Sequence, residues 1–223
     1  MCTIIAALVA VVAMLCLLDR ARADSCPESC VFSFCSTLAQ RDTFLSYSPG
    51  YATASYDLTV GIASARGGSG FDGAFIAPAV ARDRFTLLGP GPAGPIAFTG
   101  RLHVVGAASV SDAFFSAYVD GSLQEGSNPP VRASAGTGGS GENASLDQHL
   151  SLPLQHAVGE AFELIYTASA RGHGRYSNAN STGQLSFSGL PTGYWLVSCQ
   201  GFSTAPVVPV RGVTWGSLKV IYR

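Results

Sequence analysis

The fold of this chain is limited above all by a two-residue alternation of apolar and polar side chains, which recurs in short segments separated by turn-rich intervals. In residues 146–154, leucines alternate with Asp147, His149 and Ser151, and residues 160–170 repeat the pattern. Successive side chains of a β-strand point to opposite faces, so this period predicts strands with one buried face. No segment of useful length shows the 3.6-residue period of a crossover helix. The sequence therefore predicts an all-β fold, an antiparallel β-sandwich.

Three further segments are assigned from the same period and from turn chemistry. Residues 55–62 alternate and are predicted to form one strand. Residues 66–70 (RGGSG) are predicted to be a flexible loop, because glycine favours turns. The dipeptide Asp120-Gly121 is a hairpin turn signal. The sandwich is thus expected to consist of short strands joined by turns.

Residues 183–202 combine two apolar runs with the turn sequence LPTG at residues 190–193. The second run, which ends at Cys199, is apolar on both of its alternating faces. A strand with two apolar faces is expected at the centre of a sheet that is covered on each side. We therefore predict a hairpin whose second strand is central.

The first two dozen residues have the features of a cleaved signal peptide. An apolar run over residues 4–18 is followed by Ala21-Arg22-Ala23, a small-x-small cleavage site. The run is shorter than the roughly 20 apolar residues that span a bilayer, so a membrane anchor is the weaker alternative. The sequence predicts a secreted or cell-surface protein with four parts: a signal peptide (1–23), a cysteine-containing segment (24–50), a β-sandwich domain (51–204) and a C-terminal tail (205–223).

Four cysteines remain after this cleavage: Cys26, Cys30, Cys35 and Cys199. An even number in an oxidising compartment predicts two disulfides. We favour Cys26–Cys30 with Cys35–Cys199, and the alternative is Cys26–Cys35 with Cys30–Cys199. Either pairing would link the N-terminal segment to the far end of the sandwich. The C-x3-C-x4-C spacing lacks the paired C-x2-C motif of zinc sites, so no metal is expected there.

The charge balance and the absence of catalytic motifs exclude several classes of function. With 13 basic and 14 acidic residues the chain is nearly neutral, and it lacks the basic stripe of nucleic-acid-binding proteins. It contains no G-x-S-x-G, H-E-x-x-H, Walker or EF-hand motif. No catalytic residue and no cofactor is therefore predicted.

One polar cluster is the best candidate for a site. Alternation places Asp147, His149 and Glu163 on a solvent-facing side of neighbouring strands, where a weak metal or acid–base site could form. An ordinary polar sheet face is the alternative. His103 has no partner that the sequence reveals.

A second candidate is a set of aromatic residues in predicted loops. Tyr51, Phe71 and Tyr176 could together form a platform for stacking against sugars. Packing at the rim of the sandwich is the alternative.

Two segments, residues 158–164 (VGEAFEL) and 189–201 (GLPTGYWLVSCQG), carry a resemblance to a known group of proteins. They resemble secreted bacterial proteins of uncharacterised function, of the kind that carries an exosortase-type sorting tail. This resemblance covers the second half of the chain and implies a jelly-roll sandwich. The chain departs from that group in having no Pro-Glu-Pro motif followed by an apolar helix and a basic tail.

The C-terminus instead reads WGSLKVIYR. It is similar to the W-G-x-x-K-x-x-Y-R endings of otherwise unrelated secreted bacterial proteins, here Trp215, Lys219, Tyr222 and Arg223. The similarity implies a portable sorting or surface-attachment signal. A terminal element that packs on the core is the alternative.

These observations favour a non-catalytic, structural or adhesive protein, secreted or held at the cell surface. Its partners would be cell-surface or extracellular matrix components or glycans. A carbohydrate-binding module is the first alternative, and an extracellular hydrolase is the second.

Overall fold

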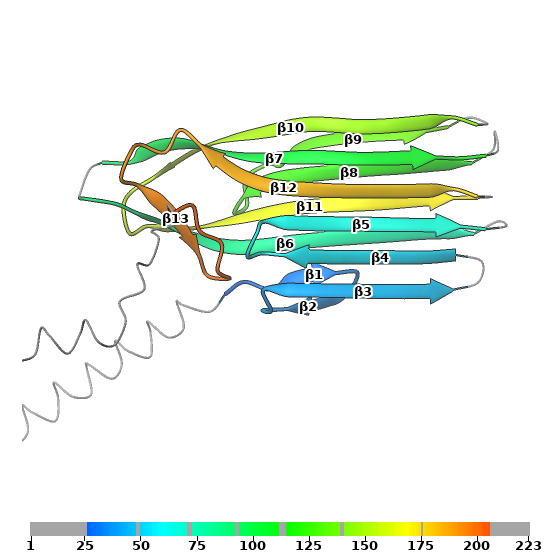
Figure 1. The fold of residues 1–223 in the computed structure, drawn as a ribbon, viewed down its shortest axis with the longest axis horizontal. Helices are drawn as coiled ribbons and strands as arrows, with labels where there is room; N and C mark the ends of the chain where they lie inside the picture. The colour runs from blue at the N-terminus through cyan, green and yellow to red at the C-terminus, as the bar shows by residue number, and fades with distance from the viewer. Residues whose placement is uncertain are drawn as a thin grey trace, which may run out of the picture.

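The structure is a computed structural model that describes residues 26–47, 50–70, 73–91, 94–111, 115–138, 141–174 and 176–205. The thirteen elements in these ranges are all β-strands, and they form two antiparallel sheets packed face to face (Figure 1). The predicted all-β antiparallel sandwich is confirmed. Residues 1–23, and the tail residues Trp215, Lys219, Tyr222 and Arg223, lie outside the described residues. Within the described ranges there is no helix with the length and hydropathy needed to cross a membrane.

The two sheets have the following strands, in spatial order. Sheet 1 contains β10 (Asn143–His156), β7 (Ile96–Ser109), β12 (Asn178–Ser188), β5 (Ile62–Ser69), β4 (Gly50–Asp57) and β3 (Gln40–Tyr47). Sheet 2 contains β2 (Phe34–Ser36), β1 (Ser29–Val31), β6 (Ala74–Leu88), β11 (Ala161–His173), β8 (Ser116–Glu125) and β9 (Val131–Thr137), with β13 (Trp195–Ser198) also paired to β6.

Strands β5 to β12 have jelly-roll topology. They pair as one long hairpin whose tip is β8–β9, with β7 against β10, β6 against β11 and β5 against β12. Successive pairs of this hairpin alternate between the two sheets, which wraps it into a double-layered roll. The described residues of the segment 24–50 add β1 and β2 to sheet 2 and β3 to sheet 1.

The hydrophobic core lies between the sheets and is built by the alternation seen in the sequence. Leu146, Leu150 and Leu154 of β10 are buried, whereas Asp147 and His149 are exposed. In β11 the predicted inward residues Phe162, Leu164 and Tyr166 are likewise buried. Burial of one face of each strand supplies the main driving force for this fold.

Close approach of the two sheets explains one incorrect prediction. Asp120 and Gly121, predicted to be a hairpin turn, lie in the middle of β8. A β-carbon at Gly121 would meet the methyl groups of Val104, on β7 of the opposite sheet, at 2.7 Å. The glycine therefore serves inter-sheet packing rather than chain reversal.

The prediction of one continuous strand over residues 55–62 is also wrong, because residues 58–61 form the turn between β4 and β5. Asp57 Oδ1 accepts hydrogen bonds from the backbone N and the Oγ1 of Thr59, at 3.0 and 2.6 Å. Gly61 adopts a φ of 71°, in the left-handed region that glycine tolerates. This side-chain-bonded turn prevails over the alternating pattern.

The glycines of residues 66–70, predicted to form a loop, belong mostly to β5. A β-carbon at Gly67 would collide with the ring of Phe75, which packs beneath it in the core. These glycines make room for aromatic rings on each side of the sheet.

Residues 183–202 do not form the predicted hairpin. The first run is β12 in sheet 1 and the second contains β13 in sheet 2, so the intervening turn carries the chain across the end of the sandwich (Figure 1). Strand β13 is not central but pairs with one end of β6. Its two apolar faces reflect its position at the end of the core, where Leu196 is fully buried.

Both predicted disulfide pairings are wrong, although the predicted link from the N-terminal segment to Cys199 exists. The disulfides are Cys26–Cys199 and Cys30–Cys35, with Cα–Cα distances of 5.6 and 4.1 Å. The tight β1–β2 hairpin places Cys30 directly opposite Cys35. Cys26 is thereby left to reach Cys199.

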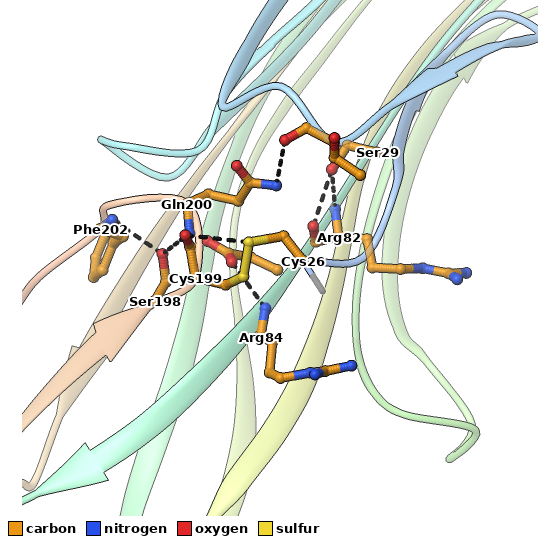
Figure 2. Close-up of a disulfide and its surroundings, with 10 residues drawn as sticks. Cys26, Ser29, Arg82, Arg84, Ser198, Cys199, Gln200 and Phe202 are labelled. Carbon is orange, nitrogen blue, oxygen red and sulfur yellow. Dashed lines mark hydrogen bonds between the residues drawn. A yellow bond between two sulfur atoms is a disulfide. The ribbon is translucent and has the colours of Figure 1, made fainter. Parts of the chain in front are cut away.

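The Cys26–Cys199 disulfide closes an edge of sheet 2 (Figure 2). Strand β1 pairs with the middle of the outer edge of β6, and β13 pairs with its C-terminal end. Between them the Ser29 hydroxyl donates a hydrogen bond to the backbone O of Arg82 and accepts one from the backbone N–H of Arg82. The Cys199 N–H donates a hydrogen bond to the backbone O of Arg84 at 2.8 Å. The disulfide joins the two covering segments, so this part of β6 presents few unpaired backbone groups.

Candidate functional site

The outward face of sheet 1 is lined mainly by polar side chains, which the strand register aligns in rows. Each row runs across the sheet in the order β3, β4, β5, β12, β7 and β10. Two neighbouring rows are Ser46, Tyr51, Gly68, Asn178, Ser109 and Asn143, and Phe44, Thr53, Arg66, Asn180, Ala107 and Ser145. The next two are Asp42, Ser55, Ser64, Thr182, Val105 and Asp147, and Gln40, Asp57, Ile62, Gln184, His103 and His149. Two features stand out on this face: an open groove with an aromatic rim, and a histidine–aspartate cluster.

The open groove runs across β3, β4, β5 and β12 and has a volume of about 440 Å³. It is lined by Asp42, Thr53, Ala54, Ser55, Ser64, Ala65, Arg66, Asn180 and Thr182. These side chains offer a carboxylate, a guanidinium, an amide and several hydroxyls, so hydrogen-bond donors and acceptors lie side by side. The hydroxyls of Ser64 and Thr182, for example, are 3.2 Å apart. We call this feature the polar groove.

The aromatic rim of the polar groove consists of Phe44 and Tyr51. Their ring centroids are 6.3 Å apart with an interplanar angle of 23°, and Phe44 is 62% exposed. The Arg66 guanidinium lies 6.0 Å from the centroid of the Tyr51 ring, within cation–π range. Gly68 provides the space beside this ring, because a β-carbon there would come within 2.9 Å of Tyr51 Cε1. Two apolar ring surfaces are therefore held next to the polar groove.

The predicted aromatic platform is only partly reproduced. Tyr51 belongs to the rim, but its partner is Phe44, which sequence reasoning missed. Tyr176 is 56% exposed in the turn between β11 and β12, and Phe71 lies outside the described residues. Phe44 could have been found from the alternation of β3, because it lies on the same outward face as the exposed residues Asp42 and Ser46.

The histidine–aspartate cluster contains two of the three residues predicted to form a polar site. Asp147 and His149 lie on the outward face of β10, and His103 of β7 lies directly opposite His149. Glu163 is in sheet 2, where its carboxylate is 3.5 Å from Arg82 Nε. The structure therefore separates Glu163 from the other two and adds His103.

The geometry of this cluster is compact. His103 Nε2 is 2.7 Å from Asp147 Oδ1, and the two imidazole rings stack with centroids 4.1 Å apart and an interplanar angle of 17°. One potential ligand atom from each of the three residues lies within 4.8 Å of the others. The alternation of Phe98, Leu102 and Val104 indicates that His103 faces outward, but its partner depends on the β7–β10 register, which the sequence does not specify.

Two buried polar groups lie in the core between the sheets: Asp83 of β6 and Tyr166 of β11. Asp83 is 1% exposed, and burial raises its pKa to about 6, although hydrogen bonds from Ser198 and from the backbone of Arg84 and Gln200 oppose the rise. Tyr166 is fully buried, and burial followed by the nearby Asp83 charge raises its pKa. Its hydroxyl has no hydrogen-bond partner among the described residues. These groups lack access to solvent and bear on stability rather than on binding.

A third polar group, His156, closes one end of the core. Its ring stacks on Phe162 with centroids 3.9 Å apart, and its Nε2 and Nδ1 lie 2.8 and 3.3 Å from carboxylate oxygens of Glu125 and Glu160. Hydrogen bonds from the Ala157 N–H and then from His156 lower the pKa of Glu160. Two carboxylate groups thus lie beside a buried imidazole at this end of the core.

Sheet 2 also has an exposed aromatic side chain. The Tyr118 ring lies over Gly136, and the Arg171 guanidinium is 5.5 Å from its centroid. An open groove of about 430 Å³ adjoins it, lined in part by the apolar residues Ala74 and Ile76. This groove offers fewer polar side chains than the polar groove of sheet 1.

Fold and site together define a disulfide-linked jelly-roll β-sandwich with a polar, aromatic-rimmed groove on one face. No protein-family model matches the chain, and no curated protein matches it. Among solved structures, one similar chain is TmCBM61 in complex with beta-1,4-galactotriose, at 8% identity and a TM-score of 0.27, covering 64% of this chain and 89% of that chain. A likeness at this level carries no argument about the ligand of this chain.

Proposed function

We propose that this protein is an extracellular, non-catalytic adhesive module that binds neutral glycan chains through the polar groove of sheet 1. The observation that carries the proposal is the position of the Phe44–Tyr51 pair beside that groove. The C–H faces of a sugar pack against aromatic rings, while its hydroxyls need both donors and acceptors. Asp42 and Arg66 balance each other in charge, which favours an uncharged ligand over an anionic or cationic one.

A non-catalytic role is favoured over hydrolysis by the composition of the polar groove. Glycosidases use two carboxyl groups placed on either side of the scissile bond. Among the described residues that line the polar groove, Asp42 is the only carboxylate. The proposal therefore assigns recognition, and not cleavage, to this face.

An extracellular location is supported by the two disulfides, which persist in oxidising compartments. We further propose that the C-terminal sequence containing Trp215 and Arg223 sorts or attaches the protein at the cell surface. Deletion of residues 214–223 followed by cell fractionation tests this role. If the truncated protein reaches the same compartment in the same amount, the C-terminus does not sort.

Glycan binding is tested by probing a glycan array with the purified chain and measuring the affinity for the best glycan by titration. The double variant Phe44→Ala/Tyr51→Ala and the single variant Arg66→Ala should each weaken binding at least tenfold. The matched control is Tyr118→Ala, which removes an exposed aromatic ring from sheet 2 and should leave the affinity unchanged. Binding that survives the double variant, or that Tyr118→Ala reduces equally, would contradict the proposal. Recovery of shortened glycan after incubation would favour the hydrolase alternative.

A further inference from the structure

We infer that His103, Asp147 and His149 form a binding site for a first-row transition-metal ion of the zinc or copper(II) type. This site lies on β7 and β10, and it is separate from the polar groove on β3, β4, β5 and β12. It goes beyond the proposed glycan binding and does not depend on it.

The first argument is that strand pairing fixes the backbone positions that carry the three side chains. His103 and His149 are directly opposed across two paired strands, and Asp147 is two residues before His149 on the same face. Strand β7 is itself flanked by β12, so the backbone that carries His103 is hydrogen-bonded on both sides. Little backbone freedom remains to be lost when a ligand ties these side chains together.

The second argument is distance. A metal ion about 2.0–2.1 Å from two nitrogens in tetrahedral geometry holds them about 3.4 Å apart. The potential ligand atoms of the three residues are already within 4.8 Å of one another. The ion would take the place of the proton between His103 Nε2 and Asp147 Oδ1, which is released to solvent, and these two atoms, now 2.7 Å apart, would separate by about 0.7 Å. Because the lone pair of an imidazole nitrogen lies in the plane of its ring, both rings must turn out of their stacked arrangement to point at one ion.

The third argument is ligand chemistry, which selects the ion. Two imidazoles and one carboxylate suit zinc, copper(II), nickel or iron(II), whereas calcium and magnesium require six or more oxygen ligands. The side chains of Asp147 and His149 are exposed, so solvent can occupy the remaining coordination positions. Three protein ligands with an open fourth position are the arrangement of zinc sites that accept an external ligand.

The test is calorimetric titration of the full, tag-free chain with zinc chloride, repeated with copper(II) followed by electron paramagnetic resonance. The wild-type chain should bind one ion with nitrogen coupling in the copper spectrum. His103→Gln, His149→Gln and Asp147→Asn should each weaken zinc binding at least tenfold. His173→Gln is the matched control, because it removes an exposed histidine from sheet 2 and should leave the affinity unchanged. Circular dichroism and melting temperature establish that each variant is folded.

Several outcomes would overturn the inference. They are equal zinc affinity in the wild type and the His103→Gln/His149→Gln double variant, equal affinity in Asp147→Asn, or an equal loss in His173→Gln. Displacement of zinc by calcium at a similar concentration would also contradict the assigned class of ion.

Discussion

The ring of Tyr51 lies beside Gly68 of the neighbouring strand, where a β-carbon would approach Tyr51 Cε1 to 2.9 Å and Asn178 Oδ1 to 2.6 Å. The same pairing of ring and glycine recurs on sheet 2 between Tyr118 and Gly136. Because an aromatic ring covers the exposed backbone of a cross-strand glycine, each pair fixes the orientation of the ring. At Gly68 this relationship positions half of the aromatic rim.

The variant Gly68→Ala should displace the Tyr51 ring. We expect a loss of about 1 kcal/mol in the free energy of unfolding from overpacking, together with weaker binding of any glycan that uses the rim. Denaturant unfolding and affinity titration measure the two effects. Gly138→Ala is the control, since a β-carbon at Gly138 meets nothing within 4 Å. If both variants bind equally well, the glycine does not position the rim.

The two disulfides should contribute unequally to stability. Cys26–Cys199 has a sequence separation of 173 residues and Cys30–Cys35 of 5. In the chain-entropy model these loops correspond to about 5 and about 2 kcal/mol respectively. Replacing each pair with serine and measuring unfolding by urea compares them. An equal loss of unfolding free energy would show that the contacts around the disulfides, rather than loop closure, determine their contribution. Peptide mapping of the unreduced protein checks which cysteines are paired.

Stability should depend on pH through Asp83. Its pKa is about 6 in the folded chain against 3.8 when unperturbed, so the folded state binds the proton more tightly. The protonated carboxyl therefore stabilises the folded state by up to about 3 kcal/mol below pH 3.8, and this stabilisation is lost as the pH rises from 3.8 through 6. Asp83→Asn should remove this dependence, so the difference in unfolding free energy between wild type and variant should fall from pH 4 to pH 7. A constant difference over that range would contradict the assignment.

The buried hydroxyl of Tyr166 should cost stability, because no described residue accepts or donates a hydrogen bond to it. Burial of an unpaired hydroxyl costs about 1–3 kcal/mol. Tyr166→Phe should therefore raise the unfolding free energy by about 1 kcal/mol in urea unfolding. Destabilisation by this amount would instead indicate a buried water that pairs with the hydroxyl.

The fold class was predictable because it rests on patterns local to each strand. Burial of Leu146, Leu150 and Leu154 follows from alternation alone, without knowledge of which strands are neighbours. The glycines were misread for the opposite reason. Gly68 and Gly121 are required by a ring and by a side chain that lie far away in sequence. A glycine indicates a turn only where the backbone itself needs glycine's conformational freedom. At Gly68 and Gly121 glycine is needed instead to leave space for a side chain of another strand.

The candidate sites were less predictable, because they depend on strand order and register. Asp147 and His149 were placed correctly on one outward face, but the neighbour that completes their cluster is His103 rather than Glu163. The disulfides show the same limit. Their pairing follows from the two-residue turn that sets Cys30 opposite Cys35, and spacing alone leaves all pairings open.

The covered edge of β6 has a consequence for how the chain must be assembled. One of its covering segments is synthesised before β6, but the other, which contains β13 and Cys199, is made only near the end of the described chain. Until then the C-terminal part of β6 is an unprotected template for a strand from another molecule. Oxidation of Cys199 therefore comes after the period of greatest risk, and we expect the newly made polypeptide to depend on a chaperone between the synthesis of β6 and that of β13.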